Sequence, residues 1–211
     1  MKIDTKTKIV LKAVELFNEK GFSNVSFLKI AQSLSLSPGN VTYHFPKKDD
    51  LMNAVYLHFQ QEILKSVPLK VDEINLSSLH NQIGDFFKLQ NNLKFFYSDL
   101  VDIVRGYPKI AELHKLHIDN QISRLHDVLN EFSRSGRLKK YESSNLYAFL
   151  SRQLWLTGSF WLSRCIVRGM KHDMEELQEQ AWSLIYPHLT DKGKQELSKL
   201  IDIAKFTCLH Q

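Results

Sequence analysis

The sequence SFLKIAQSLSLSPGNVTYHF, residues 26–45, contains two signals for the start of a helix, eleven residues apart. Ser26 and Ser37 are of the residue type that caps helix N-termini, and Pro38 follows the second cap where its missing N–H group costs nothing. An apolar residue precedes each cap and another lies four positions into each helix, which is the spacing of a hydrophobic staple. The stretch therefore predicts two short helices joined by a tight turn, a helix-turn-helix.

The second predicted helix carries side chains that suit contact with a DNA duplex. Asn40 has the paired donor and acceptor that can recognise adenine in the major groove, while Pro38 and Gly39 let the helix tip approach the bases. Hydroxyl, imidazole and ammonium groups near the helix ends suit backbone phosphates, which set the register of a protein on DNA. These residues are Ser26, Ser37, Thr42, Tyr43, His44 and Lys48. For Tyr43 and His44 the alternative is packing between helices.

The charge of the chain is compatible with a polyanionic partner. The 211 residues carry a formal net charge of +5. Residues 1–60 hold 8 Lys and Arg against 5 Asp and Glu, and the remaining residues hold 20 against 18, so the positive excess is modestly concentrated at the front. A basic face is usually only a solvated face. Beside a helix-turn-helix it has more weight, because neutralised phosphates supply much of protein–DNA affinity.

The rest of the sequence predicts an all-α fold, because apolar residues recur at helical spacing and no alternating stretch bounded by turns occurs. A helix from Lys48 leads away from the motif, and Pro68 marks its exit. Further helices are predicted at residues 77–90, 93–104, 110–134, 143–167, 174–189 and 191–206. The predicted organisation is an N-terminal domain of residues 1–47, a connecting helix of residues 48–68 and a helical domain of residues 69–211.

Features of secreted and membrane proteins are missing from the sequence. The two cysteines, Cys165 and Cys208, have no CxxC spacing, so we predict neither a disulfide framework nor a thiolate metal site. The N-terminus lacks the pattern of a signal peptide, and polar residues interrupt the most apolar stretch, residues 149–167. We therefore expect a cytoplasmic protein without a membrane span.

Enzyme motifs are also missing. No HExxH, glycine-rich phosphate loop or GxSxG sequence occurs, so we expect no enzyme and no cofactor. His114 and His117 lie one helical turn apart and could bind a metal only if further ligands converged on them. We predict no metal site.

Taken together, residues 7–57 resemble the N-terminal part of TetR-family transcriptional regulators. The resemblance is carried by Ile9-Val10, Ala13-Val14, Leu16-Phe17, Lys20-Gly21-Phe22, Ile30-Ala31, Pro38-Gly39-Asn40 and Tyr43-His44-Phe45, followed by Lys48 and Leu51. It implies phosphate contacts by Tyr43, His44 and Lys48. The chain departs from the family at Ser35, where glycine is usual, and at Thr42, where an aromatic residue is usual. Ser35 must then adopt a turn conformation that favours glycine.

The resemblance also implies that the C-terminal helices form a homodimer and enclose an effector cavity. The predicted helix near residues 145–168 has a wide apolar face, and the small residues around Gly158 permit a close helix crossing there. In the family such helices pair into a four-helix interface between subunits. The alternative is core within one chain, and in either case we expect the face to be buried.

Aromatic residues are dense in the region where family members bind effectors, although ordinary core packing would explain them as well. The predicted pocket comprises Phe87, Phe96, Tyr97, Arg105, His117, Gln121 and Trp155. It would suit a small, mostly apolar molecule. The sequence thus predicts a DNA-binding transcriptional regulator, a ligand-released repressor that acts as a homodimer on a pseudo-palindromic double-stranded operator. The alternative is an all-α small-molecule-binding or interaction protein without operator-specific DNA binding.

Overall fold

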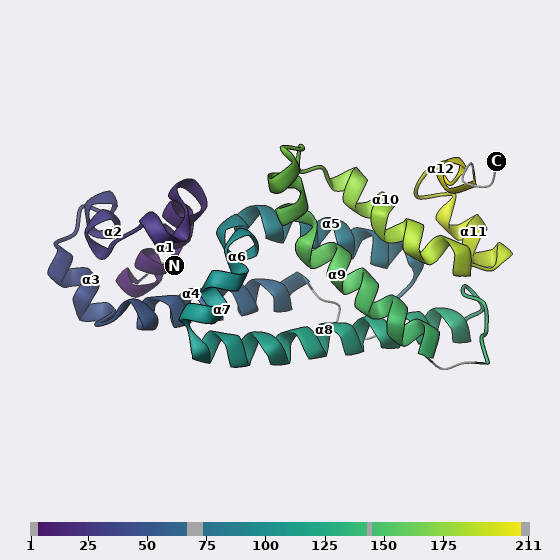
Figure 1. The fold of residues 1–211 in the computed structure, drawn as a ribbon, viewed down its shortest axis with the longest axis horizontal. Coiled ribbons are helices and arrows are strands. Elements are labelled where there is room, and N and C mark those ends of the chain that lie inside the picture. The colour runs from purple at the N-terminus through teal and green to yellow at the C-terminus, as the bar shows by residue number, and fades with distance from the viewer. Residues whose placement is uncertain (1–3, 67–73, 143–144, 208–211) are drawn as a thin grey trace. The chain divides into compact units, whose positions relative to one another are not determined.

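A computed structural model describes residues 4–66, 74–142 and 145–207. Within these ranges the backbone forms helices and connecting segments, and the single β feature is an isolated bridge between Leu138 and Leu189 (Figure 1). The predicted all-α fold is confirmed. No helix in the described ranges is long and apolar enough to cross a membrane.

The N-terminal helices are α1 (Thr5–Lys20), the 3-10 turn η1 (Phe22–Asn24), α2 (Phe27–Ser33), α3 (Pro38–His44) and α4 (Lys48–Ser66). The helices that follow are α5 (Leu76–Asn92), α6 (Lys94–Ser98), α7 (Leu100–Gly106), α8 (Pro108–Arg134), α9 (Asn145–Arg168), α10 (Met174–Ile185), the 3-10 turn η2 (Tyr186–His188), α11 (Asp191–Leu197) and α12 (Ala204–Thr207).

Helices α2 and α3 form the predicted helix-turn-helix, and both predicted caps are present. The Ser26 hydroxyl accepts a hydrogen bond from the N–H of Lys29 at 3.4 Å, and the Ser37 hydroxyl accepts one from the N–H of Asn40 at 3.3 Å. These bonds satisfy donors that the first turn of a helix leaves without a helical partner. Pro38 occupies the first position of α3, as predicted.

The turn between α2 and α3 depends on Ser35, whose φ angle is 55°. Among the described residues it is the only one other than glycine with positive φ. The N–H of Ser35 donates to Gln32 at 3.2 Å and the N–H of Leu36 donates to Ala31 at 2.9 Å, which is the Schellman pattern of a helix end. The predicted glycine-like conformation of Ser35 is confirmed, and it costs roughly 1 kcal/mol.

Two predicted helices are interrupted in the structure. Residues 93–104 form α6 and α7, because Asp99 leaves the helical path at φ −107° and ψ 15°. Residues 191–206 form α11, a stretch of turns, and α12, whose first turn is capped where the Asp202 carboxylate accepts the N–H of Ala204 at 3.0 Å. Short carboxylate side chains compete for backbone donors and therefore favour helix ends over helix interiors.

Contacts within the chain divide it into two compact units. The N-terminal unit comprises residues 1–65 and 89–115, and the C-terminal unit comprises residues 66–88 and 116–211. The N-terminal unit thus contains α6 and α7 as well as the helix-turn-helix, while α5 and α8 contribute to both units. The domain boundaries after residues 47 and 68 stay a prediction.

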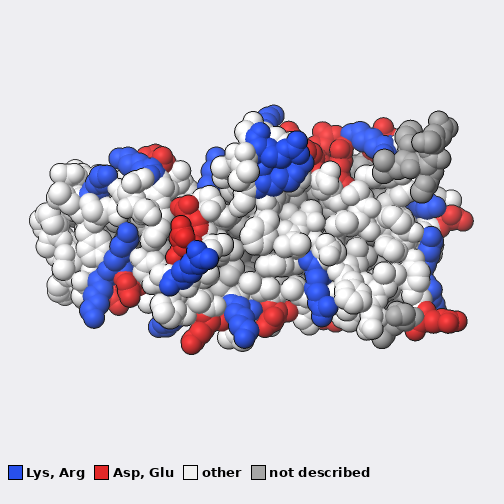
Figure 2. Space-filling view, viewed as in Figure 1, with Lys and Arg blue, Asp and Glu red and all other residues white. Residues whose placement is uncertain are grey.

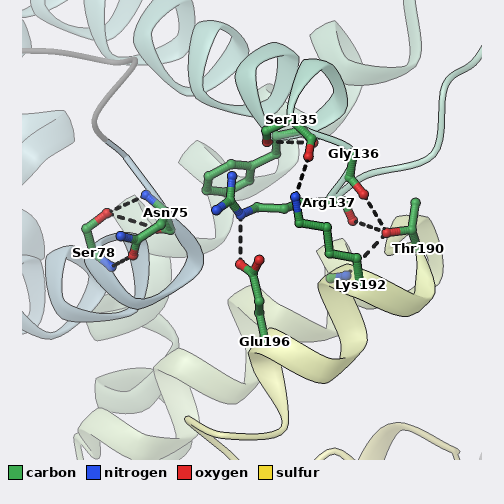
Figure 3. Close-up of polar contacts among 10 residues, drawn as sticks. Asn75, Ser78, Ser135, Gly136, Arg137, Thr190, Lys192 and Glu196 are labelled. Atoms are coloured by element: carbon green, nitrogen blue, oxygen red, sulfur yellow. Dashed lines mark hydrogen bonds and ion pairs between the residues drawn. The ribbon is translucent and has the colours of Figure 1, made fainter.

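In the C-terminal unit, polar contacts tie the residues after α8 to α11 (Figure 3). The Thr190 hydroxyl accepts the N–H of Gly193 at 3.2 Å and donates to the carbonyl of Gly136 at 2.7 Å. The Nε of Arg137 donates to the Glu196 carboxylate at 2.7 Å. We call these five residues the α8–α11 clasp.

Helix α9 has a packed side and an open apolar side. Its buried residues are Tyr147, Leu150, Ser151, Trp161, Leu162 and Cys165. Five large apolar residues of α9 are exposed. Four of them, which we call the α9 stripe, are Phe149 (58% exposed), Leu156 (47%), Phe160 (39%) and Val167 (86%), and the fifth, Ile166 (55%), lies outside this spacing. The alternative that the whole apolar face is core within one chain is therefore wrong for these residues, and its burial between two subunits stays a prediction. At Gly158 a Cβ atom would lie 3.3 Å from the ring of Phe86 on α5, so a side chain fills this space, and the close helix crossing stays a prediction.

Candidate nucleic-acid interface

Helix α3 is anchored by one side chain and presents the others. Of its seven residues only Val41 is buried. Pro38, Gly39, Asn40, Thr42 and Tyr43 are exposed, and His44 is partly buried. None of the residues of α3 is Lys, Arg, Asp or Glu, and the surface around it is mostly uncharged on the face drawn in Figure 2. Such a helix can enter a groove and contact base edges without desolvating a charge.

The three side chains at the C-terminal end of α3 differ in availability. Tyr43 is 80% exposed, so the alternative that it packs between helices is wrong. The ring of His44 lies edge-on to it, with 5.2 Å between centroids. The Thr42 hydroxyl donates to the carbonyl of Pro38 at 3.1 Å. Because phosphate oxygens only accept hydrogen bonds, Thr42 can bind one only by giving up this bond.

Ser26 and Lys48, both predicted to contact phosphates, line one shallow depression at the start of α2. The other lining residues are Ser23, Asn24, Val25, Phe27 and Lys29. The Lys48 ammonium lies 4.5 Å from the centroid of the Phe22 ring, a cation–π contact that fixes its position. The Lys29 ammonium donates to the carbonyl of Asn24 at 2.7 Å. Two cations held at one depression suit a DNA phosphate.

Lys29 is a member of this depression that the sequence analysis missed. It lies three residues after the Ser26 cap, in the first turn of α2, and this position places a side chain near the helix N-terminus. A search for cations in the first turn of each predicted helix would have found it.

The residues predicted to line an effector pocket are divided between the two units. Phe96 and Tyr97 are buried in the N-terminal unit, and Arg105 is exposed on α7. Phe87, His117, Gln121 and Trp155 are partly buried in the C-terminal unit. Whether they share one pocket stays a prediction. Among the described residues, no three His, Cys, Asp or Glu gather in a way that could hold a metal ion.

Phe96 belongs to an aromatic cluster that joins α4 to α6 and α8 within the N-terminal unit. Its ring stacks on Phe59 with 4.4 Å between centroids, and the Tyr56 hydroxyl lies 3.2 Å from Nδ1 of His114. Burial raises the pKa of the Tyr56 and Tyr97 hydroxyls above the ordinary value, so both are neutral. The cluster therefore holds α4 by apolar packing and by the hydrogen bond between Tyr56 and His114.

The fold and this interface define a helix-turn-helix DNA-binding protein with a helical C-terminal part. Residues 9–60 match the family model of bacterial regulatory proteins of the tetR family, and residues 58–197 match the TetR model described as a bacterial transcriptional repressor. The chain belongs to the TetR family. This is a family of transcriptional regulators and not of enzymes.

One curated relative is the probable HTH-type transcriptional regulator YttP of Bacillus subtilis, which is 35% identical over 96 residues. This match covers 44% of the chain and 46% of YttP, so the chain spans about half the length of that relative. Among solved structures, a TetR-family regulator of Marinobacter aquaeolei has a TM-score of 0.83 at 22% identity, covering 94% of this chain and 97% of that one. The SmeT–triclosan complex has a TM-score of 0.63 at 16% identity, covering 89% and 92%. At these identities the solved structures show the fold alone.

Proposed function

We propose that the protein is a ligand-released repressor that binds a pseudo-palindromic operator as a homodimer. The observation that carries the DNA-binding part is the presentation of α3, which Val41 anchors while Asn40 stays exposed. The Asn40 carboxamide suits adenine, and the neighbouring Pro38 and Gly39 let the backbone approach the bases.

Phosphate contacts would flank these base contacts. Lys48 and Ser26 line the depression at the start of α2, and Lys29 joins them there. The remaining proposed phosphate-binding residues are Ser37, Tyr43 and His44. Thr42 is the weakest member of the predicted set, because its hydroxyl already donates to Pro38.

The α9 stripe supports the homodimer. Its members stand at positions 149, 156, 160 and 167, and steps of seven and four residues return to the same side of an α-helix. An exposed apolar surface of this kind marks an interaction site. Pairing with a second copy would cover it, and it would also double the base contacts, of which one helix-turn-helix supplies few.

A small, mostly apolar effector is the proposed signal. Aromatic side chains are dense in both units, and the structurally similar SmeT was solved with triclosan bound. Helix α4 runs from Lys48 at the DNA-facing depression to Tyr56 and Phe59 in the aromatic cluster. A change in the packing of α4 would alter the spacing of two recognition helices, which must fit major grooves about 34 Å apart.

The operator proposal is tested with duplexes that the full-length protein selects from fragmented genomic DNA. We expect sequence-selective, salt-dependent gel shifts, a two-fold symmetric site and a dimer by light scattering. A monomer that binds a half-site as tightly as the full site would exclude the homodimer. Duplex binding without sequence preference would favour the alternative, an all-α binding or interaction protein.

The effector proposal is tested by calorimetry, with triclosan as the first probe. Binding should weaken operator affinity by ~1–3 kcal/mol, and operator should weaken triclosan binding by the same factor, because coupling between two sites is reciprocal. A probe that binds the protein and leaves operator affinity unchanged would exclude release by that molecule.

A further inference from the structure

Asn18 of α1 bridges the break between α5 and α6. Helix α5 ends at Asn92 and α6 begins at Lys94, so backbone groups of both helices lack helical partners at the break. The Nδ2 of Asn18 donates to the carbonyl of Asn92 at 2.8 Å, and its Oδ1 accepts the N–H of Phe95 at 3.1 Å. The N-cap residue of α6, Leu93, makes no side-chain cap. Asn18 therefore caps both helix ends from a different element.

Asp99 makes a second connection of the same kind. It stands at the N-cap of α7 but makes no side-chain cap there, and its carboxylate accepts the N–H of Phe22 at 3.4 Å instead. Apolar contacts run beside these bonds. The rings of Phe17 and Phe95 lie 5.1 Å apart, and those of Phe22 and Tyr107 lie 5.8 Å apart. Helix α1 and η1 thus contact α6, the residue before α7 (Asp99) and the residue after α7 (Tyr107).

The same part of α1 also supports the helix-turn-helix. Phe17 and Phe22 are buried and pack edge to face, with 5.5 Å between centroids, and Lys48 at the DNA-facing depression lies over Phe22. Helix α1 packs on α2, which in turn packs on α3. A displacement of α6 would therefore reach α3 through α1, without passing along α4.

We infer that Asn18 is a positioning residue for DNA binding, because its hydrogen bonds make residues 92–99 and the helix-turn-helix move together. The position and orientation of α3 relative to DNA then depend on α6 as well as on α4. The consequence for affinity rests on the operator binding proposed above, whereas the coupling of α1 to α6 does not.

The coupling is tested without DNA by hydrogen exchange of the full-length protein. Ala31→Gly removes a fully buried methyl group from α2 and should raise exchange in α2 and α3. In an otherwise wild-type chain we expect exchange of residues 93–99 to rise with it. With Asn18→Ala added, that response should shrink, and the Phe95 N–H should exchange about ten-fold faster. The inference is wrong if Ala31→Gly leaves hydrogen exchange in α6 unchanged. It is also wrong if Ala31→Gly raises that exchange equally in chains with Asn18 and with Asn18→Ala.

Affinity for a duplex selected from a random library is the second measurement. Asn18→Ala should weaken binding roughly three- to ten-fold at a temperature where the protein is folded. Asn18→Asp keeps an acceptor for Phe95 but sets a carboxylate oxygen against the carbonyl of Asn92, so it breaks the connection to α5 and should weaken binding as Asn18→Ala does. It decides the matter if Asn18→Ala does not fold. Asn120→Ala, at an exposed position on α8, is the matched control.

The two measurements separate the two ideas. If the wild-type protein selects no duplex, the proposed operator binding fails while hydrogen exchange still decides the coupling. If Asn18→Ala is folded and binds the selected duplex as tightly as wild type, the positioning role is wrong.

Discussion

Helices α3 and α11 have nearly the same N-terminal cap but differ in the tertiary contacts around it. Each has seven residues, and each is capped by a hydroxyl that accepts the N–H three residues on, at 3.3 Å for Ser37 and 3.2 Å for Thr190. The Ser37 hydroxyl caps a helix whose one buried residue is Val41, whereas the Thr190 hydroxyl also donates to the carbonyl of Gly136 within the α8–α11 clasp. The capping signal thus predicts a helix, and tertiary polar partners decide whether its end is available for a ligand.

The largest expected effect comes from adding one methyl group to each helix. A Cβ at Gly193 would lie 2.3 Å from the carbonyl oxygen of Arg137, so Gly193→Ala should destabilise the protein by ~3 kcal/mol. A Cβ at Gly39 meets nothing nearer than the Ser37 hydroxyl at 3.9 Å, so Gly39→Ala should keep or raise stability. Urea denaturation of both variants is the measurement. Equal stability losses would mean that the two helices do not differ in packing as described.

Asn40→Ala should act on specificity and leave stability alone. Its side chain is exposed, and a base contact of this type is worth ~1–3 kcal/mol, so binding to the operator should weaken by that amount while random DNA is bound as before. Fluorescence titration of both duplexes is the measurement. Equal losses on operator and random DNA would reject the assignment of Asn40 to base contact.

Lys48→Ala should act on affinity for every sequence. If the ammonium contacts one phosphate, its loss lowers the slope of log affinity against log salt concentration by ~0.9. The cation–π contact with Phe22 is lost as well, so stability is measured in parallel. Lys140→Ala, at an exposed position of the C-terminal unit, should leave the slope unchanged. An unchanged slope in Lys48→Ala would mean that the Lys48 ammonium contacts no DNA phosphate.

The helix-turn-helix could be predicted from the sequence because its signals are local. The Ser26 and Ser37 caps act over three residues, and both were found where the pattern indicated. The break at Asp99 was missed because its carboxylate bonds to Phe22, 77 residues away, and Asn18 was missed because its partners are 74 and 77 residues away. Such pairs leave no periodic signal.

For α9 the sequence predicted a wide apolar face and left open whether that face packs within one chain or between two subunits. Apolar residues surround this helix, so their spacing alone could not indicate which side packs on the same chain. The structure leaves Phe149 and Phe160 exposed while it buries Leu150 and Trp161. The apolar residues of α9 predict that this side of the helix is buried against another helix. The sequence of α9 does not specify whether that helix belongs to the same chain or, as proposed here, to a second copy.

The smallest expected effects come from the turns beside the two helices. Ser35 before α3 has φ 55°, and Gly136 in the clasp has φ 75° with no atom within 4 Å of a Cβ built there. Ser35→Gly relieves the strain of a positive φ but gives the unfolded chain more freedom, so we expect a gain below ~1 kcal/mol. Gly136→Ala introduces the same strain without a steric clash and should cost ~1 kcal/mol. Thermal denaturation of both variants and of the double variant is the measurement, and the two effects should add because the sites lie in different units. If Ser35→Gly destabilises the protein, the serine side chain stabilises the turn by more than the strain of its positive φ costs. Ser35 and Gly136 would then differ in side-chain contribution as well as in residue type.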